Sequence, residues 1–305
     1  MIVEDDIEAL EGRAEFPAPS EDANQPLNDI DAVDVSERGR YLSNEIYLIS
    51  VIIPCYNEGE RIYRNLQECL RSLGELKKPF EIIAVNDGSS DNTLKELNRL
   101  AMVHPEVVPV TYGKNAGKGN ALRVGTLKAR GDLIIFMDAD LEIHPRHAAT
   151  FIKTMERTGA DMVIGSKRHP YSKVDYPPKR RLLSYGYHIM VRALFGLKLT
   201  DTQPGFKLAK REVLIKEMYK SKVDRYAFDL ELLVNADADG FKIVEAPIEL
   251  NFSRPLGGRI GFRSVKSIFS ETMDIFLRHR LNKSSDRIPK ASAQKKLPDK
   301  DLQSP

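Results

Sequence analysis

Short apolar runs alternate with amphipathic stretches along the first half of this chain, starting at residue 47. The runs end at proline, glycine or polar residues, which is typical of buried strands. The stretches between them carry apolar residues three or four positions apart, which predicts helices that bury one face. The predicted strands are residues 47–54, 80–88, 107–113 and 132–140, and the predicted helices are residues 57–76, 91–105 and 120–131.

This alternation of strand and helix favours parallel strands joined by helical crossovers. We therefore expect an α/β fold with a Rossmann-like, mostly parallel central sheet and flanking helices. Ligands of such sheets bind beyond the carboxyl ends of the strands. Three of the four strand ends carry polar pairs, which we expect to converge on one crevice: Asn57 and Glu58, Asn86 and Asp87, and Asp138 and Asp140.

The second half of the chain continues the pattern and then changes character. Its predicted elements are helices at 147–159, 180–196 and 228–240, strands at 161–169 and 242–252, and a strand-like piece leading into a helix at 205–219. Residues 259–282 combine bulky apolar positions with arginine and lysine, which predicts an amphipathic helix with a basic face. The predicted parts are an acidic tail (1–45), the α/β domain (46–258), this helix (259–282) and a basic tail (283–305).

Charge separates the two ends of the chain from its middle. Residues 1–40 hold twelve Asp or Glu against three Lys or Arg, and residues 278–305 hold eight Lys or Arg against three Asp or Glu. We expect both ends to be disordered or loosely docked, either as solvated tails or paired with each other. The net charge of +2 gives no support to nucleic-acid binding.

Two features bear on the compartment of the protein. Two cysteines, Cys55 and Cys69, are too few for a disulfide framework and suit a reducing, cytoplasmic setting. The acidic N-terminal residues lack the apolar core of a secretory signal, and the apolar run at residues 182–191 is too short to span a bilayer. We therefore expect a cytoplasmic protein with no transmembrane segment.

The pair Asp138 and Asp140 ends an apolar strand with two carboxylates. Residues i and i+2 face the same side of a strand, so both carboxylates are expected to address one divalent cation. Mg²⁺ in proteins is usually held by one or two carboxylates together with substrate phosphates. The alternative is a surface turn with two solvated acids, since Asp-x-Asp alone is a weak signal.

Two further segments suit a nucleotide ligand. Residues 85–93 place Asp87 at a strand end before Gly88, so that the carboxylate can meet a base or a ribose and the backbone can come close. The alternative is an ordinary strand-to-helix turn capped by Asp91 or Thr93. Residues 113–125 resemble a phosphate cradle at a helix start, although they match neither the P-loop spacing nor the dinucleotide-binding spacing.

A resemblance to a known family rests on four stretches in chain order: VIIPCYNEGERI, VNDGSSDNT, NAGKGNALRVGTLKARG and FMDADLEIHP. Together they resemble the GT-A fold of the inverting family 2 glycosyltransferases. Three later stretches, GSKRH, DTQPGFKLAKREV and RYAFDLELL, are similar to the polyprenyl-phosphate sugar transferases. Among these, the dolichyl-phosphate glucosyltransferase type looks closer than the mannosyl type.

The resemblance implies roles for particular residues. Catalytic roles fall to Asp138, Asp229, Lys167 and Arg168, and metal binding falls to Asp138 and Asp140. Contacts to the nucleotide sugar fall to Pro54, Tyr56, Asn57, Glu58, Asp87, Lys118, Asp138, Ala139 and Gln203. Acceptor contacts fall to Gln203, Phe206, Arg180, Arg181 and Glu231, and Gly205 helps to shape the sugar side.

The implied reaction moves glucose or mannose from a UDP- or GDP-hexose to a polyprenyl (dolichyl) phosphate, with inversion and with Mg²⁺ or Mn²⁺. The metal and Lys118 stabilise the leaving diphosphate, while Lys167 or Arg168, with Arg180 or Arg181, hold the acceptor phosphate. A sugar hydroxyl acceptor instead needs a base, for which Asp229 is the candidate. A nucleotidyltransferase and a non-catalytic nucleotide-sugar binding protein are the remaining alternatives.

Membrane contact is indicated by two segments. Residues 179–196 and the helix after residue 261 each combine arginine or lysine with a bulky apolar face. Interfacial helices have this pattern, and so do core helices with a solvated rim. We expect peripheral attachment to the cytoplasmic face of a membrane.

Overall fold

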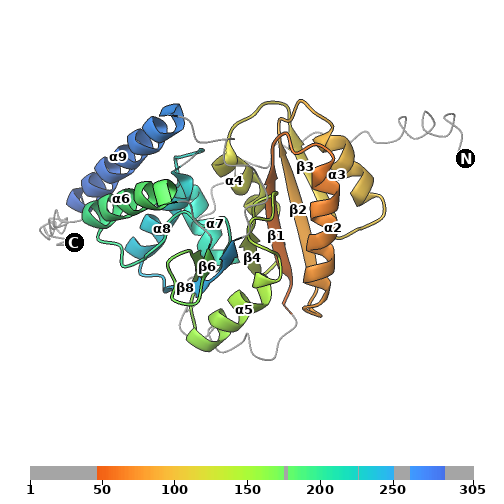
Figure 1. Ribbon diagram of the computed structural model, residues 1–305, viewed down its shortest axis with the longest axis horizontal. Helices are drawn as coiled ribbons and strands as arrows, with labels where there is room; N and C mark the ends of the chain where they lie inside the picture. The colour runs from red at the N-terminus through yellow and green to blue at the C-terminus, as the bar shows by residue number, and fades with distance from the viewer. Residues whose placement is uncertain (1–46, 175–177, 226, 251–261, 286–305) are drawn as a thin grey trace, which may run out of the picture. The chain divides into compact units, whose positions relative to one another are not determined.

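The structure is a computed structural model that describes residues 47–174, 178–225, 227–250 and 262–285 (Figure 1). The predicted tail at 1–45 lies outside the described residues, and so does the predicted basic tail from residue 286 onward. The boundary predicted at 258–259 also falls outside them. The division of the chain into those parts therefore stays a prediction.

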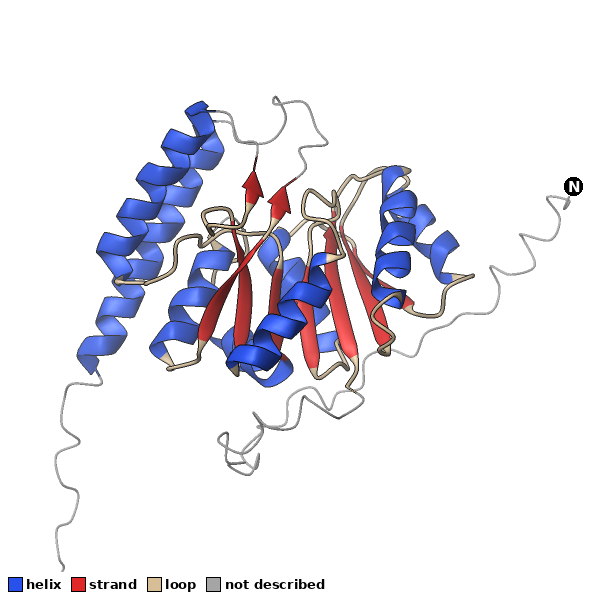
Figure 2. Ribbon diagram, turned by 60° about the horizontal axis from the view of Figure 1, so that its bottom comes forward, coloured by secondary structure: helices blue, strands red, loops and turns tan. Residues whose placement is uncertain are grey.

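A seven-stranded sheet forms the centre of the described chain (Figure 2). In sheet order its strands are β3 (Val107–Tyr112), β2 (Phe80–Asp87), β1 (Ile49–Cys55), β4 (Leu133–Phe136), β7 (Lys207–Lys210), β5 (Met162–Ser166) and β8 (Ile243–Pro247). The pairs β3–β2, β2–β1, β1–β4 and β5–β8 are parallel, and β7 runs antiparallel to both β4 and β5. The mostly parallel α/β sheet is confirmed.

The strand order reverses at β1. The chain moves outward from β1 to β2 and β3, and α4 (Lys118–Lys128) then returns it to β4 on the other side of β1. Such a switch point opens a crevice beyond the carboxyl ends of the two central strands, where α/β proteins bind ligands. The acidic pair predicted as a metal site follows β4 directly, at this crevice.

Two hydrophobic clusters cover the two faces of the sheet. One contains buried residues of α2 (Arg61–Gly74), α3 (Thr93–Ala101) and α5 (His147–Thr158). The other contains buried residues of α4, α7 (Arg211–Lys220) and α8 (Phe228–Ala238). Because successive strand residues point to opposite faces, Ile49, Val51 and Ile53 join the first cluster while Ile52 joins the second.

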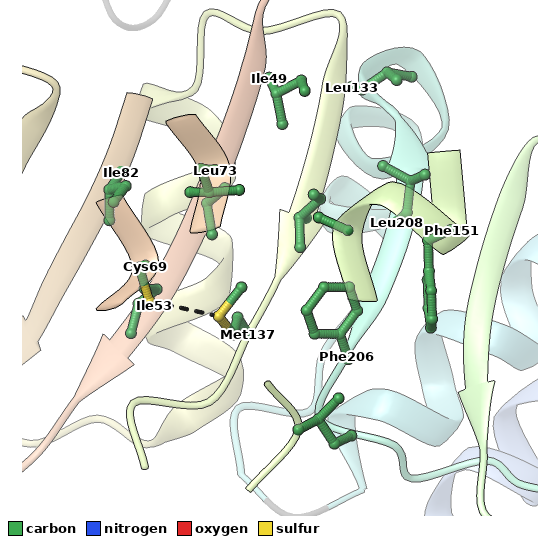
Figure 3. Close-up of a cluster of buried hydrophobic side chains, with 14 of the residues drawn as sticks. Ile49, Ile53, Cys69, Leu73, Ile82, Leu133, Met137, Phe151, Phe206 and Leu208 are labelled. Atoms are coloured by element: carbon green, nitrogen blue, oxygen red, sulfur yellow. Dashed lines mark hydrogen bonds between the residues drawn. The ribbon is translucent and has the colours of Figure 1, made fainter. Parts of the chain in front are cut away.

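The first cluster reaches the end of β4, as Figure 3 shows. Both cysteines are buried free thiols, and Cys69 Sγ lies 3.8 Å from Met137 Sδ. Burial is the main reason that the pKa of the Cys55 thiol is raised well above its ordinary value. These cysteines therefore pack as small apolar residues.

Two helices lie side by side outside the second cluster (Figures 1 and 2). They are α6 (Pro178–Phe195) and α9 (Phe262–Ser285). Tyr187 and Thr272 join them through their hydroxyls at 3.1 Å, and the rings of Phe195 and Phe276 meet edge to face at 5.9 Å. A small parallel sheet of β6 (Lys173–Val174) and β9 (Glu249–Leu250) completes the fold.

Some predicted boundaries differ from the observed ones. The strand predicted at 132–140 ends at Phe136, and the strand predicted at 242–252 is divided into β8 and β9 around Ile248. Each predicted strand continues into loop residues that are largely buried. The apolar pattern therefore extends beyond the residues that pair in the sheet. Within the part of the chain that the structure describes, no helix combines the length and apolarity needed to cross a bilayer.

Candidate active site

The acidic pair lies in a turn, which we call the acid turn (residues 138–141). After β4, Met137 N donates to Ile52 O at 3.1 Å, and the chain then folds back so that Leu141 N donates to Asp138 O at 3.2 Å. Leu141 has a φ of 54°, a left-handed conformation outside any strand. A turn, not the two-residue period of a strand, sets the directions of Asp138 and Asp140, so the prediction that both face one side of a strand is wrong.

The acid turn is attached to the neighbouring elements at two points. Asn65 of α2 donates its side-chain N–H to Ala139 O at 2.7 Å, and the Ala139 side chain is buried. A Cβ built on Gly205 would lie 1.9 Å from Asp138 Oδ2. A side chain at position 205 would therefore displace the Asp138 carboxylate from its present position, so the turn before β7 lies directly against that carboxylate.

Four charged side chains of alternating sign extend from the acid turn into the interior. We call them the charge chain: Asp138, Lys118, Asp229 and Lys207. Lys118 Nζ lies 2.7 Å from Asp138 Oδ1 and 3.9 Å from Asp229 Oδ2, and Lys207 Nζ lies 2.7 Å from Asp229 Oδ1. The sequence brings them from α4, the acid turn, α8 and β7 to one place.

The two ends of the charge chain differ in exposure. The Lys118 and Asp138 side chains are 37% and 41% exposed, whereas those of Lys207 and Asp229 are 3% and 10% exposed. Burial by itself would raise the pKa of Asp229, but Lys207 and then Lys118 outweigh it and lower that pKa below its ordinary value. Asp229 is thus held as a carboxylate.

Lys118 is also held in its charged form. Burial by itself would lower its pKa, but Asp138 and then Asp229 outweigh this and raise the pKa above its ordinary value. Lys118 therefore presents a permanent positive charge at the open end of the charge chain.

Asp87, expected to meet a base or ribose, is held by protein donors. Its carboxylate accepts from Tyr112 Oη at 2.8 Å, Asn115 Nδ2 at 2.8 Å, Ala116 N at 2.7 Å and Gly117 N at 3.0 Å. The side chain is buried, and these bonds use both carboxylate oxygens. In this structure Asp87 fixes the glycine-rich loop, and its nucleoside contact stays a prediction.

The prediction that backbone N–H groups at the start of α4 form a phosphate cradle is wrong. Gly119 N and Asn120 N donate to Asp224 O at 2.8 and 3.2 Å. A helix N-terminus binds anions through N–H groups that lack a partner, and these two have one. The side chain of Lys118, rather than the backbone, therefore remains as the anion-binding element of this segment.

The residues after β1 join those after β2. Asn57 has a φ of 52°, its N–H donates to Ser89 Oγ at 3.0 Å, and its Oδ1 accepts from Ser90 N at 2.9 Å. Glu58 N donates to Thr93 Oγ1 at 2.9 Å. These bonds bring the first two predicted polar strand ends together. The Tyr56 side chain beside them is 43% exposed and open to a ligand.

The predicted cations Lys167 and Arg168 follow β5 and meet the segment that precedes β7. Lys167 lies against Asp201, through its backbone N–H at 3.1 Å and its Nζ at 3.4 Å. Gln203 N donates to the same carboxylate at 3.2 Å, and an Arg168 N–H donates to Thr200 O. Asp201 thus holds two predicted ligand-binding residues in place.

The structure corrects two acceptor contacts. Phe206 is fully buried, and its ring packs edge to face on Phe151 at 4.8 Å. Glu231 is also buried, and its carboxylate accepts hydrogen bonds from α9 and from the loop between α7 and α8. Phe206 and Glu231 therefore shape the site from behind. Arg180 and Arg181 lie in the first turns of α6, and their side chains lie outside the described residues.

Sequence reasoning missed Lys207, Asp201 and Glu245. Asp201 lies in one of the motifs quoted above, so the motif was available as a signal. Glu245 Oε1 supports it by accepting from Thr200 N at 2.8 Å and Asp201 N at 3.0 Å. Lys207 lies in the same motif, but nothing in the local pattern marks Glu245 or the partner of Lys207, because these contacts form only in the folded sheet.

A metal at the acid turn is consistent with the donor set. Among the described residues no group of three His, Cys, Asp or Glu side chains could hold an ion. Asp138 and Asp140 alone supply two carboxylates, which is the usual protein share of a Mg²⁺ site completed by substrate phosphates. The ammonium group 2.7 Å from Asp138 indicates that this position favours positive charge.

Comparison with known proteins decides the family. The model of glycosyl transferase family 2 matches residues 50–217, which include β1 from its second residue, the strands β2 to β7 and the acid turn. The chain belongs to glycosyl transferase family 2. The match agrees with the resemblance found in the sequence motifs, and it sets the nucleotidyltransferase alternative aside.

Relatives of this family 2 chain include two dolichyl-phosphate beta-glucosyltransferases. The one from Trichomonas vaginalis is 34% identical over 225 residues, which are 68% of this chain and 65% of that protein. The human one is 33% identical over 232 residues, which are 70% of this chain and 69% of that protein. This chain thus spans about two thirds of the length of the curated relatives it matches.

Solved structures confirm the GT-A fold. Glucosyl-3-phosphoglycerate synthase from Mycobacterium tuberculosis, in complex with Mn²⁺, UDP and glucosyl-3-phosphoglycerate, aligns with a TM-score of 0.57 and 19% identity. The alignment covers 76% of this chain and 80% of that chain. At this identity the likeness establishes the arrangement of the sheet and helices.

Proposed function

We propose that this protein transfers glucose from UDP-glucose to a dolichyl (polyprenyl) phosphate at a membrane surface, with inversion at the anomeric carbon. The names of the relatives support the glucosyl group and the lipid acceptor. The switch point of the sheet at β1 and β4, with the acid turn and Lys118 beside it, supports a nucleotide-sugar site.

The observation that carries the proposal is the pairing of Asp229. A hydroxyl acceptor needs a general base that can take up its proton. Asp229, the residue expected in that role, is bound to Lys207 at 2.7 Å and its pKa is lowered, which makes it a weak base. A phosphate acceptor is already ionised at neutral pH and needs no base. The charge chain therefore favours a lipid phosphate.

The leaving group is served by the open end of the charge chain. Cleavage of the sugar–phosphate bond leaves extra negative charge on the nucleoside diphosphate, and Lys118 is placed to stabilise it. A Mg²⁺ or Mn²⁺ ion held by Asp140 and Asp138 would supply further positive charge to the diphosphate. The ammonium group of Lys118, 2.7 Å from Asp138, lies close enough to the same carboxylates to contact the diphosphate as well.

The acceptor is served by the cations after β5. Lys167 and Arg168 lie close to Gln203, where β5 ends and β7 begins. A charged hydrogen bond from either cation would hold the lipid phosphate while one of its oxygens attacks the sugar carbon. Attack occurs on the face opposite the leaving diphosphate, so the anomeric configuration inverts.

Peripheral membrane contact is part of this proposal. The α6–α9 pair exposes large apolar side chains on both helices: Tyr185, Ile189, Phe269 and Leu277. Each is more than half exposed, and the inner faces of the same helices are buried against each other. Such helices lie in the interface of a bilayer with their apolar side chains among the lipids. We place the protein on the cytoplasmic face.

Release of UDP from UDP-glucose tests the proposed function. With Mn²⁺, we expect release when polyprenyl phosphate is added, and none when a neutral polyprenol or a free sugar replaces it. Asp140→Ala is expected to reduce this release at least a hundredfold, because the diphosphate loses its charge compensation. Release that requires a sugar hydroxyl acceptor and ignores polyprenyl phosphate would contradict the proposal.

A further inference from the structure

A short loop between α7 and α8 connects α9 to the active site. We call residues 221–225 the bridging loop. Its first residues are held by Glu231, whose Oε2 accepts from Ser221 Oγ at 2.6 Å, Lys222 N at 2.9 Å and Val223 N at 2.8 Å. Glu231 lies in α8 and is 2% exposed. One buried carboxylate oxygen thus fixes the path of the loop.

The same carboxylate is bound by α9. Arg278 of α9 donates to Glu231 Oε1 at 2.6 Å. A second residue of α9, Glu271, accepts from Ala227 N at 2.8 Å at the start of α8. Between these two points the loop and α9 line an open cavity of about 570 Å³. The polar bonds at Glu231 and Glu271 therefore join α9 to this region together with the buried side chain of Ile275.

On its other side, the bridging loop is bound to the first turn of α4. Asp224 O accepts from Gly119 N and Asn120 N, and Arg123 of α4 donates to Asp224 Oδ1 at 2.5 Å and to Ser221 O at 3.1 Å. The loop and α4 consequently share four hydrogen bonds, two of them from the first turn of the helix.

The packing at this contact leaves no room for a side chain on either of two glycines of α4 and its N-cap. A Cβ built on Gly117 would lie 2.6 Å from Asp224 O, and one built on Gly119 would lie 2.8 Å from Asp224 C. The backbone of the bridging loop therefore rests directly on the backbone of α4. Because the two backbones are also joined by hydrogen bonds, we expect displacement of the loop to displace the first turn of the helix.

The first residue of α4 is Lys118, whose ammonium group meets Asp138 in the acid turn. We propose that Glu231 and Arg278 are positioning residues that couple the docking of α9 to the placement of Lys118. The proposal deepens the proposed function and rests on it for its purpose: a helix at the membrane surface would set the donor site for transfer to a lipid. The physical coupling itself is independent of the acceptor.

Amide hydrogen exchange of the full chain tests the coupling. Arg278→Ala removes a charge-assisted hydrogen bond to a buried carboxylate, which we expect to loosen the bridging loop and its bonds to α4. Exchange at Gly119 and Asn120 should accelerate about tenfold or more, while exchange within β1 and β2 should stay unchanged. Glu231→Gln keeps the shape of the side chain and should accelerate the same amides.

The matched control is Arg280→Ala, which removes an exposed arginine two positions along the same helix. It should leave exchange at Gly119 and Asn120 as in the wild type. Arg278→Lys should restore part of the protection, since a lysine can still donate to Glu231. Wild-type exchange at the two amides in Arg278→Ala would overturn the proposal. Acceleration that extends equally to β1 would also overturn it, because it reports general loosening.

The two KM values distinguish a positioning role from a merely structural one, which would not change the KM of one substrate alone. Arg278→Ala should raise the KM for UDP-glucose several-fold and leave the KM for polyprenyl phosphate unchanged, because Lys118 belongs to the donor side. Equal changes in both KM values would contradict donor-side coupling. If the protein shows no transfer to polyprenyl phosphate, the proposed function fails while the exchange result still decides the coupling.

Discussion

Lys118 and Asp138 illustrate how far single residues can be interpreted from the sequence. Both were identified from motifs, and the structure brings them to 2.7 Å. The contacts of these residues with Asp229 and Lys207 could not be predicted, because a motif does not show which side chains from distant elements meet. Asp87 shows the opposite limit: its motif indicated a ligand contact, but its oxygens bind the glycine-rich loop. A motif identifies a residue as important without saying whether it binds ligand or protein.

Glu217 of α7 leads to a stability prediction. Its side chain is fully buried. Neither of its carboxylate oxygens accepts a hydrogen bond from the described residues. Burial is the main reason that its pKa is raised from 4.5 to about 7. Between these pH values the unfolded chain releases the proton first, so this residue makes the folded state less stable as pH rises, by about 1.4 kcal/mol per unit. Above pH 7 the effect levels off.

Glu217→Gln removes this titration. Relative to wild type, we expect the variant to gain stability as pH rises from 5 to 7, up to about 3 kcal/mol at pH 8. Urea unfolding of both proteins at several pH values measures the difference, and Glu60→Gln, at an exposed position, controls for the loss of one charge. A difference between wild type and Glu217→Gln that is constant from pH 5 to pH 8 would contradict the prediction.

At the scale of elements, periodicity predicted the strands and helices well and their ends less well. Each of the four predicted strands of the first half is present, since a buried strand needs a continuous apolar run. The end of β4 was missed because Met137 and Ala139 stay buried after the ladder stops. The antiparallel direction of β7 was also not foreseen, because strand direction leaves no trace in the alternation of side chains.

The exposed face of the α6–α9 pair can be tested by itself. The protein should co-sediment with liposomes that contain anionic lipid, and added salt should weaken this binding. Replacing Ile189 and Leu277 together with glutamate should reduce the bound fraction at least tenfold, because two large apolar contacts become charged. Met102 is an exposed apolar residue at the C-terminal end of α3, away from α6 and α9. Met102→Glu is therefore the matched control and should bind liposomes as the wild type does.

Wild-type protein that stays in the supernatant at low salt would contradict the membrane assignment. Equal binding by the Ile189→Glu, Leu277→Glu variant would show that another surface makes the contact. Neither outcome would alter the interpretation of the acid turn, since the donor site is built from different elements.

At the scale of the whole molecule, the sheet topology explains why the chemistry lies where it does. The switch point between β1 and β4 places the acid turn, the start of α4 and the segment before β7 at one edge. The helices on the second face then connect this edge to α9 through the bridging loop. Donor binding and the proposed membrane face are thus linked by contiguous hydrogen bonds.

The central claim is that glucose is joined to a lipid phosphate with inversion, and the product itself tests it most directly. The enzyme is given UDP-glucose labelled with carbon-13 at C1, polyprenyl phosphate and Mn²⁺, and the extracted lipid is examined by NMR. We predict a β-configured anomeric carbon whose signal is split by coupling to phosphorus. An α-configured carbon, or one without phosphorus coupling because glucose is attached to a hydroxyl, would contradict the account.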